Sequence, residues 1–248
     1  MLAIIGGSGL TQLANLEVVR REIVRTPYGD PSGAITYGTI RGQEVAFLAR
    51  HGYGHTIPPH KVNYRANMWA LAQAKVKYVV AVASVGGIRR DMGPGVLAIP
   101  DQIVDYTHGR CHTYFEGNDR SVVHVDFTHP YCEPLRERLA RAAAEAGESI
   151  LQGGTYAATQ GPRLESAAEI NRLERDGADM VGMTGMPEAA LARELGLCYA
   201  AIAVVVNYAA GREDSAEGIR MADINAVSRE ALSRVHKILD SLVTLDGD

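Results

Sequence analysis

The sequence has few cysteines and no long hydrophobic run. Its three cysteines, Cys111, Cys132 and Cys198, are an odd number and include no C-x-x-C pair among 248 residues. We therefore expect reduced thiols in a cytoplasmic protein rather than a disulfide framework. The longest apolar run, from Cys198 to Val206, has about half the length of a membrane-spanning helix. We therefore expect no membrane segment. The first residues lack the basic region of a signal peptide, so we expect a buried first strand there.

An excess of positive charge is also missing. The chain carries 25 Lys and Arg against 29 Asp and Glu, a net charge of −4. No global positive field therefore exists to attract nucleic acid, and any anionic ligand must be bound locally. The His and Cys residues near positions 108–112 and 124–132 lack a zinc-site spacing. The sequence also has no G-x-S-x-G motif of a hydrolase, so we expect neither a metal nor a serine-hydrolase triad.

What the sequence does have is an alternation of short apolar runs and longer helical patterns. This alternation predicts a single α/β domain over residues 1–248, with a mostly parallel sheet covered on both faces. The predicted strands are Leu2–Ile5, Ala34–Ile40, Glu44–Ala49, Tyr78–Ser84, Leu97–Val104, Gly154–Ala158, Met180–Gly182 and Leu197–Asn207. The predicted helices are Lys61–Ala74, Glu133–Ala146, Ser166–Asp176, Pro187–Leu195 and Ala222–Leu245. The polar segment Asp105–Thr128 is expected to be a long irregular loop.

Polar residues follow several predicted strands at the point where the strand ends. Arg50 and His51 end an apolar run and open a loop rich in Gly, Pro and His, where a guanidinium suits phosphate oxygens. A solvated basic loop is the plain alternative. Gly6-Gly7-Ser8-Gly9 follows the first strand and could hold an anion with backbone N–H groups. A structural tight turn explains this glycine run equally well.

Three further strand ends repeat the pattern. Ser84 is followed by two glycines, and Thr184 stands before a predicted helix, where N–H groups favour an anion. The longest apolar run stops at Asn207, whose amide can both donate to and accept from a heterocycle edge; an ordinary turn asparagine is the alternative. Because strand ends of an open α/β sheet meet at one rim, these clusters predict a pocket for a ligand with an anion, hydroxyls and a flat polar ring.

At these residues the chain resembles the trimeric purine nucleoside phosphorylases. The resemblance rests on Gly7-Ser8-Gly9-Leu10, Arg50-His51-Gly52, Gln160-Gly161-Pro162-Arg163 and Gly182-Met183-Thr184 with Pro187-Glu188. The segment HTIPPHKVNYRAN (55–67) resembles the methylthioadenosine phosphorylase branch. The family fold is one α/β domain around a twisted mixed sheet flanked by helices, assembled as a homotrimer with sites at subunit interfaces. Its reaction is reversible phosphorolysis of a purine nucleoside, with inorganic phosphate as co-substrate and no cofactor.

The resemblance also implies roles for individual residues. Arg50, His51 and Asn207 would form the catalytic set. Met183 would pack on the ribose, and His124 matches a histidine that the branch contributes from a neighbouring subunit. Phosphate would be held by Ser8, Arg50, His51, Ser84 and Thr184, and the substrate pocket would include Met183, Asn207, Glu165, Leu164, Ala83, Gly86, His124, Ile219 and Met221.

Two departures from the branch concern the base. Adenine-specific enzymes carry Asp-Tyr-Asp where this chain has Asn207-Tyr208-Ala209. Asn207 could donate to a 6-oxo oxygen and accept from N7–H. Glu165 stands where oxopurine enzymes place a glutamate that accepts from N1–H, and an ionised carboxylate would repel adenine N1. Mismatches of this kind discriminate by roughly 10⁴-fold. A carboxylate that stabilises a helix N-terminus is the alternative role for Glu165.

The sugar end departs in another direction. Inosine and guanosine enzymes carry a histidine soon after the Asn, whereas here Ile219 and Met221 occupy that region, which suits an apolar 5′ group. The expected reaction is therefore phosphorolysis of S-methyl-5′-thioinosine to hypoxanthine and 5-methylthioribose 1-phosphate. A methylthioadenosine phosphorylase, a general inosine/guanosine phosphorylase, a hydrolase and a non-catalytic nucleoside-binding protein remain alternatives.

Overall fold

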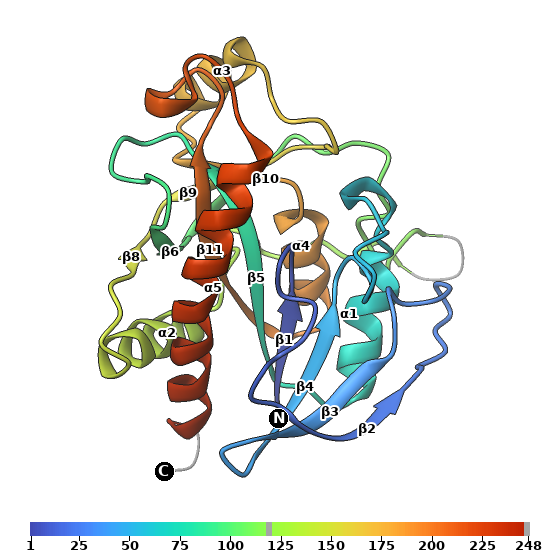
Figure 1. Ribbon diagram of the computed structural model, residues 1–248. Helices are drawn as coiled ribbons and strands as arrows, with labels where there is room; N and C mark the ends of the chain where they lie inside the picture. Colours follow the sequence, from blue (N-terminus) through green and yellow to red (C-terminus); the bar gives the residue numbers. More distant parts are fainter. Residues whose placement is uncertain (118–120, 246–248) are drawn as a thin grey trace.

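The computed structural model describes residues 1–117 and 121–245, and the strands in them form one mixed sheet between helices (Figure 1). The expected fold class is thereby confirmed. The strands are β1 (Leu2–Gly6), β2 (Glu17–Glu22), β3 (Ile35–Ile40), β4 (Gln43–Ala49), β5 (Tyr78–Gly87), β6 (Leu97–Ile99), β7 (Gln102–Asp105), β8 (Leu151–Gln152), β9 (Thr155–Ala158), β10 (Met180–Gly182) and β11 (Cys198–Tyr208). The helices are α1 (Tyr64–Gln73), α2 (Glu133–Glu145), α3 (Ala167–Arg175), α4 (Gly185–Glu194) and α5 (Met221–Thr244).

Helices cover both faces of the central strands. α2 and α5 pack together over one face, on apolar side chains of β1, β4, β5 and β11, and α5 crosses the front of Figure 1. α1 and α4 pack together over the opposite face. Burial on both faces explains why these strands are continuous apolar runs rather than alternating ones. No helix in the described residues has the length and apolarity needed to cross a membrane.

The central strand β5 changes partners along its length. Its first half pairs with β1 in parallel, up to Ala81 opposite Ile5. Its end, Gly86 and Gly87, pairs with β10 in the antiparallel direction. Among the described strands, residues 82–85 between these two stretches pair with β11 alone. The sheet is therefore split on one side of β5, next to the ends of β1 and β4.

Three strands differ from the sequence prediction, and two of them, β2 and the two-residue β8, were not predicted at all. β2 was missed because all six of its residues are exposed, so it has no apolar pattern; it lies at the sheet edge, paired with β3 alone in the path of the sheet. The strand predicted over Leu97–Val104 is two strands, β6 and β7, with Pro100 and Asp101 between them. Pro100 has no N–H to donate to a ladder, and β6 then pairs with β11 and β8 while β7 pairs with β9.

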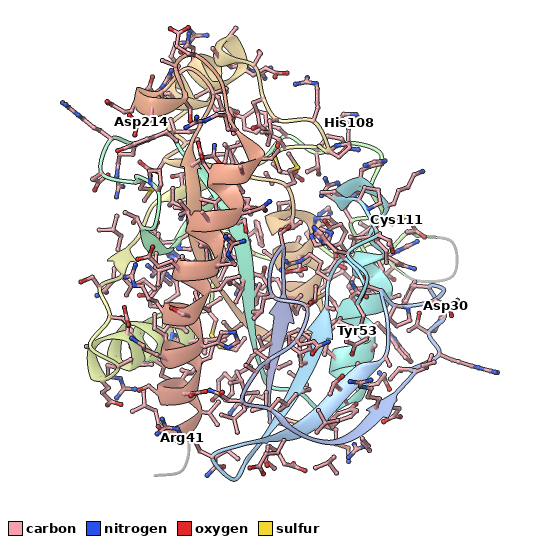
Figure 2. All side chains as sticks on the ribbon, viewed as in Figure 1. Asp30, Arg41, Tyr53, His108, Cys111 and Asp214 are labelled. Carbon is pink, nitrogen blue, oxygen red and sulfur yellow. A yellow bond between two sulfur atoms is a disulfide. The ribbon has the colours of Figure 1, made fainter. Side chains whose placement is uncertain are left out.

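The segment after β7 is irregular, as predicted. Its described parts, residues 106–117 and 121–132, contain no helix or strand. Side-chain bonds nevertheless hold it to the domain: Thr113 donates to Glu194 of α4 and Tyr114 donates to the carbonyl of Arg65 in α1. Figure 2 shows His108 and Cys111 of this segment on the same side of the molecule as α1.

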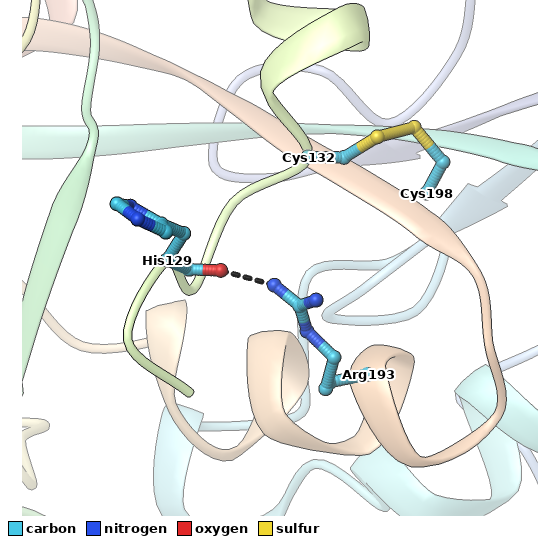
Figure 3. Close-up of a disulfide and its surroundings, with 4 residues drawn as sticks. All are labelled: His129, Cys132, Arg193 and Cys198. Atoms are coloured by element: carbon cyan, nitrogen blue, oxygen red, sulfur yellow. Dashed lines mark hydrogen bonds between the residues drawn. A yellow bond between two sulfur atoms is a disulfide. The ribbon is translucent and has the colours of Figure 1, made fainter. Parts of the chain in front are cut away.

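The expectation of reduced thiols was wrong for two of the three cysteines. Cys132 and Cys198 form a disulfide, with Cα atoms 5.2 Å apart (Figure 3). The two residues are 66 positions apart in the sequence, and it is the packing of the start of α2 on β11 that brings them together. Cys111 is free and exposed. The cytoplasmic location, argued in part from reduced thiols, stays a prediction.

Removal of the disulfide should lower the stability of the fold. A bond that closes a long loop stabilises a protein by about 2–4 kcal/mol, chiefly through the unfolded chain. We expect dithiothreitol to lower the urea midpoint of the wild-type protein, and Cys132→Ser to lower it equally without any further response to dithiothreitol. Cys111→Ser should keep the full response. A Cys132→Ser midpoint equal to that of the oxidised wild type would show that the bond contributes nothing.

Candidate active site

The five polar strand ends meet at one cavity of about 770 Å³. The cavity lies where β5 leaves β1, so the ends of β1, β4, β10 and β11 all open onto it. The sequence-predicted residues that line it are Ser8, Arg50, His51, Ala83, Ser84, Gly86, Leu164, Glu165, Met183, Thr184, Asn207, Ile219 and Met221. The prediction that these strand ends share one rim is confirmed, and only His124 of the predicted site lies elsewhere.

The glycine run after β1 is both a tight turn and a wall of the cavity. The N–H of Leu10 donates to the carbonyl of Gly7 at 3.0 Å, which closes the turn. A Cβ on Gly7 would lie 2.5 Å from the carbonyl oxygen of Val82 and 3.0 Å from Nη1 of Arg50. Only glycine fits this approach. Ser8 beside it is half-buried, and its Oγ lies 3.4 Å from Nε2 of His55.

Arg50 is held by a buried ion pair. Its Nε and Nη2 donate to the two carboxylate oxygens of Glu188 at 2.7 and 2.8 Å, and its Nη1 donates to the carbonyl of Val82 at 3.0 Å. The side chains of Arg50 and Glu188 are 1% and 0% exposed. Burial alone would lower the pKa of the Arg50 guanidinium, but Glu188 outweighs it and raises that pKa overall. Arg50 is therefore a permanent cation in a fixed orientation.

The ion pair has further support and spare donors. Tyr199 of β11 donates its hydroxyl to Oε1 of Glu188 at 2.9 Å, which adds a third bond to the carboxylate. The backbone N–H of Arg50 donates to Gly6 at 2.9 Å, which ties the ends of β4 and β1 together. A guanidinium has five N–H groups, and the three bonds to Glu188 and Val82 leave two for a ligand.

His51 is a neutral ring rather than a second cation. Burial, followed by the charge of Arg50, lowers the pKa of His51 to about 4. Its Nδ1 donates to the carbonyl of Ile57 at 2.8 Å, so in the neutral ring Nε2 is the acceptor. The ring meets that of His55 edge to face, with centroids 4.9 Å apart. At neutral pH the positive charge next to the Gly7 turn therefore comes from Arg50.

Asn207 and Glu165 lie at another part of the same cavity. The register of β11 on β5 shifts between Val205 and Asn207, and the amide of Asn207 donates one hydrogen to the carbonyl of Tyr208 at 2.5 Å. This bond fixes the amide and leaves its second hydrogen and its oxygen for a ligand. One oxygen of Glu165 accepts from Thr159 at 2.6 Å, which leaves the second for a ligand.

Glu165 does not stabilise the N-terminus of a helix, which was its alternative role; Glu169 does so instead. α3 begins after Ser166, and Ser166 and Glu169 form a reciprocal capping box. The side chain of Glu169 accepts from the N–H of Ser166, and Ser166 accepts from the N–H of Glu169. Glu165 precedes the cap and lines the cavity instead.

Met183 and Thr184 follow β10 at the start of α4. The N–H of Thr184 donates to the buried hydroxyl of Tyr156 at 3.3 Å, and Thr184 is only 6% exposed. Met183 is half-buried and lines the cavity. Tyr156 thus fixes the turn that presents both residues.

The remaining predicted residues form an open, apolar end of the cavity. Met221 and Leu164 are 62% and 42% exposed, and Ile219 is half-buried. His124 is exposed in this chain and does not line the cavity. Its predicted contribution to a neighbouring subunit's site stays a prediction.

Sequence reasoning missed several residues of the site. Glu188 was seen only as part of a motif, because nothing local shows that it pairs with a residue 138 positions away. One face of α5 was missed as well: Ile224, Asn225, Ser228, Arg229 and Leu232 line the cavity. Their spacing of three and four residues after Met221 is the signal that could have placed them on that face.

Breaking the ion pair should strongly destabilise the fold. Glu188→Gln leaves the Arg50 charge buried without a counter-charge, which costs about 3–5 kcal/mol in comparable sites. Glu174→Gln is the matched control, because Glu174 bonds Arg212 at 2.8 Å but is 57% exposed, and such pairs contribute less than about 1 kcal/mol. Urea unfolding of both variants measures the difference. Equal losses would mean that the buried pair does not hold the site.

Comparison with known proteins gives the same picture. The profile of the Phosphorylase superfamily matches residues 1–244. A probable S-methyl-5′-thioinosine phosphorylase of Pseudomonas syringae pv. tomato is 54% identical over 96% of each chain. A probable 6-oxopurine nucleoside phosphorylase of Thermococcus kodakarensis is 50% identical over 85% of this chain and 80% of its own length.

A solved structure agrees at the level of the fold. The methylthioadenosine phosphorylase of Schistosoma mansoni in complex with adenine superposes with a TM-score of 0.94 at 31% identity, covering 99% of this chain and 91% of its own. With a family profile that spans nearly the whole sequence, the chain belongs to the phosphorylase superfamily.

Proposed function

We propose that the protein catalyses the reversible phosphorolysis of S-methyl-5′-thioinosine to hypoxanthine and 5-methylthioribose 1-phosphate. One observation carries this proposal: a single cavity joins a fixed cation, an Asn207–Glu165 pair and an apolar end at Ile219 and Met221. These three parts match the phosphate, the 6-oxopurine and the methylthio group of the reactants. The related S-methyl-5′-thioinosine phosphorylases support the same substrate.

Phosphate would bind between the Gly7 turn, Ser84 and Thr184. Arg50 supplies the charge through its two remaining N–H groups. Neutral His51 supplies an acceptor at Nε2, which suits the hydroxyl of monohydrogen phosphate. A phosphate oxygen then attacks C1′ as the C1′–N9 bond breaks. Because Arg50 is oriented before the reaction, charge stabilisation needs little reorganisation.

The leaving base would be held by Asn207 and Glu165. The free hydrogen of the Asn207 amide donates to O6, and its oxygen accepts from N7–H. The proton that N7 gains balances the one that monohydrogen phosphate loses on forming the ester, so the base leaves without full negative charge. The second oxygen of Glu165 accepts from N1–H. With adenine, both the Asn207 hydrogen and the Glu165 oxygen would face the wrong partner, and such mismatches can cost roughly 10⁴-fold.

The family resemblance implies a homotrimer with shared sites, and the open apolar end supports a contact with a neighbouring copy. Leu164 and Met221 are large apolar side chains that line the cavity yet remain 42% and 62% exposed in one chain. A neighbouring copy that covers them would close the methylthio end of the pocket and could bring His124 to it. We include this assembly in the proposal.

A methylthioadenosine phosphorylase is the second candidate, favoured by the likeness to the Schistosoma mansoni enzyme in complex with adenine. A general 6-oxopurine phosphorylase is the third, favoured by the Thermococcus kodakarensis relative. The three differ in the base and in the 5′ group, so a comparison of substrates separates them.

The test is base release from methylthioinosine, methylthioadenosine and inosine, each with and without phosphate. We expect phosphate-dependent turnover, with kcat/KM for methylthioinosine at least about a hundredfold above that for methylthioadenosine. A preference for methylthioadenosine would contradict the roles of Asn207 and Glu165. Equal use of inosine would contradict the apolar 5′ end. Turnover without phosphate would indicate a hydrolase, and binding without turnover a non-catalytic protein.

The base contact has its own test. Asn207→Asp replaces the donor to O6 with an acceptor for the 6-amino group of adenine. We expect the kcat/KM ratio of methylthioinosine to methylthioadenosine to fall at least about tenfold. Asn225→Asp is the control, since it adds the same carboxylate to the α5 wall of the cavity and should leave the ratio within about twofold. An unchanged ratio in Asn207→Asp, or an equal change in both variants, would refute the contact.

A further inference from the structure

Arg110 is a buried arginine in the irregular segment after β7. It is 9% exposed, although the labelled residues on either side of it, His108 and Cys111, are exposed (Figure 2). Arg110 does not line the cavity, and none of the roles assigned above uses it. A cation removed from water requires compensation, so its partners are informative.

The guanidinium of Arg110 joins two segments that line the cavity. Nη1 donates to the carbonyls of Met183 and Met186 at 2.8 and 2.7 Å. Nη2 donates to the carbonyls of Thr159 and Gln160 at 3.2 and 2.9 Å, and Nε donates to the side chain of Gln160 at 3.1 Å. These five acceptors are uncharged, and so is a sixth and more distant one, the hydroxyl of Tyr64 at 3.4 Å from Nη1.

Under the proposed function, each of the two segments binds a different part of the nucleoside. Residues 159–165 include Thr159, which bonds the Glu165 carboxylate at 2.6 Å. Residues 183–186 include Met183 at the sugar. The segments also touch directly, because a Cβ on Gly161 would lie 2.4 Å from the sulfur of Met183. Because Arg110 bonds both segments, it stands where the distance between the base contacts and the sugar contacts is determined.

We propose that Arg110 is a positioning residue that fixes the base-binding segment 159–165 relative to the sugar-binding turn at Met183. The proposal rests on the proposed function of the cavity. Gln160 completes the arrangement, because its side chain accepts from the N–H of His108 and donates to the His108 carbonyl. The irregular segment thus acts on the nucleoside without touching it.

The main phosphate contacts, Arg50 and His51, do not depend on Arg110. Thr184 lies between the two carbonyls that Nη1 of Arg110 bonds, but it has a separate support of its own. Arg50 is held by Glu188 and Val82, His51 by Ile57, and Thr184 by Tyr156. Loss of Arg110 should therefore affect the nucleoside and phosphate unequally. A residue that only stabilised the fold would reduce the amount of active protein and leave both KM values unchanged.

The test compares the steady-state kinetics of Arg110→Lys and Gln160→Leu with those of wild type, with methylthioinosine and phosphate as substrates. The assay temperature is kept well below the melting temperature of each protein. A lysine keeps the charge but cannot reach both segments with its single ammonium. We expect Arg110→Lys to raise the nucleoside KM about tenfold or more and to change the phosphate KM by less than about threefold. Gln160→Leu should raise the nucleoside KM by about threefold and should again leave the phosphate KM unchanged.

Arg136→Lys is the matched control. Arg136 has an 11% exposed side chain and donates to the carbonyl of Pro100, away from the cavity, so both KM values should stay unchanged. The proposal would be overturned if folded Arg110→Lys had a nucleoside KM within about twofold of the wild-type value. If Arg110→Lys does not fold, the same result in Gln160→Leu would overturn it. So would an equal rise of both KM values. If wild type itself does not turn over methylthioinosine, the proposed function fails instead.

Discussion

The buried ion pair between Arg50 and Glu188 is the constraint on which the site depends. It joins the end of β4 to α4, and its remaining partners, Val82 and Tyr199, belong to β5 and β11. Removing one partner of a buried pair leaves an uncompensated charge, so the pair and its bonds tie these four elements together. The same bonds leave Arg50 with two donors beside the Gly7 turn. The cation is thus oriented by the core rather than by a ligand.

The second constraint is the split of the sheet at β5. Ladder bonds normally fill both sides of a central strand, but residues 82–85 have a partner strand on one side only among the described strands. Backbone groups of a sheet edge thereby lie inside the molecule, next to the Gly7 turn and Ser84, and Arg50 bonds one of them, the carbonyl of Val82. The cavity is a consequence of topology, and the loops from β9, β10 and β11 add the base and sugar contacts. Arg110 then holds two of those loops at a fixed separation.

Much of the site could be predicted because it lies at strand ends, where an apolar run gives way to a polar residue. Ser84 and Asn207 are visible in this way from the sequence alone, and the family resemblance gave them roles. Glu188 and the Cys132–Cys198 bond could not be predicted, since both depend on contacts between residues far apart in the chain. β2 could not be predicted either, because an exposed edge strand has no buried face to leave a pattern.

The most direct test of this account is a crystal structure of the protein with hypoxanthine and phosphate bound. We predict O6 and N7 of the base at the Asn207 amide, N1 at the Glu165 carboxylate, and phosphate against Ser84 and Thr184 with the Arg50–Glu188 pair intact. A base turned with N1 away from Glu165, or a phosphate bound through an Arg50 released from Glu188, would contradict the account.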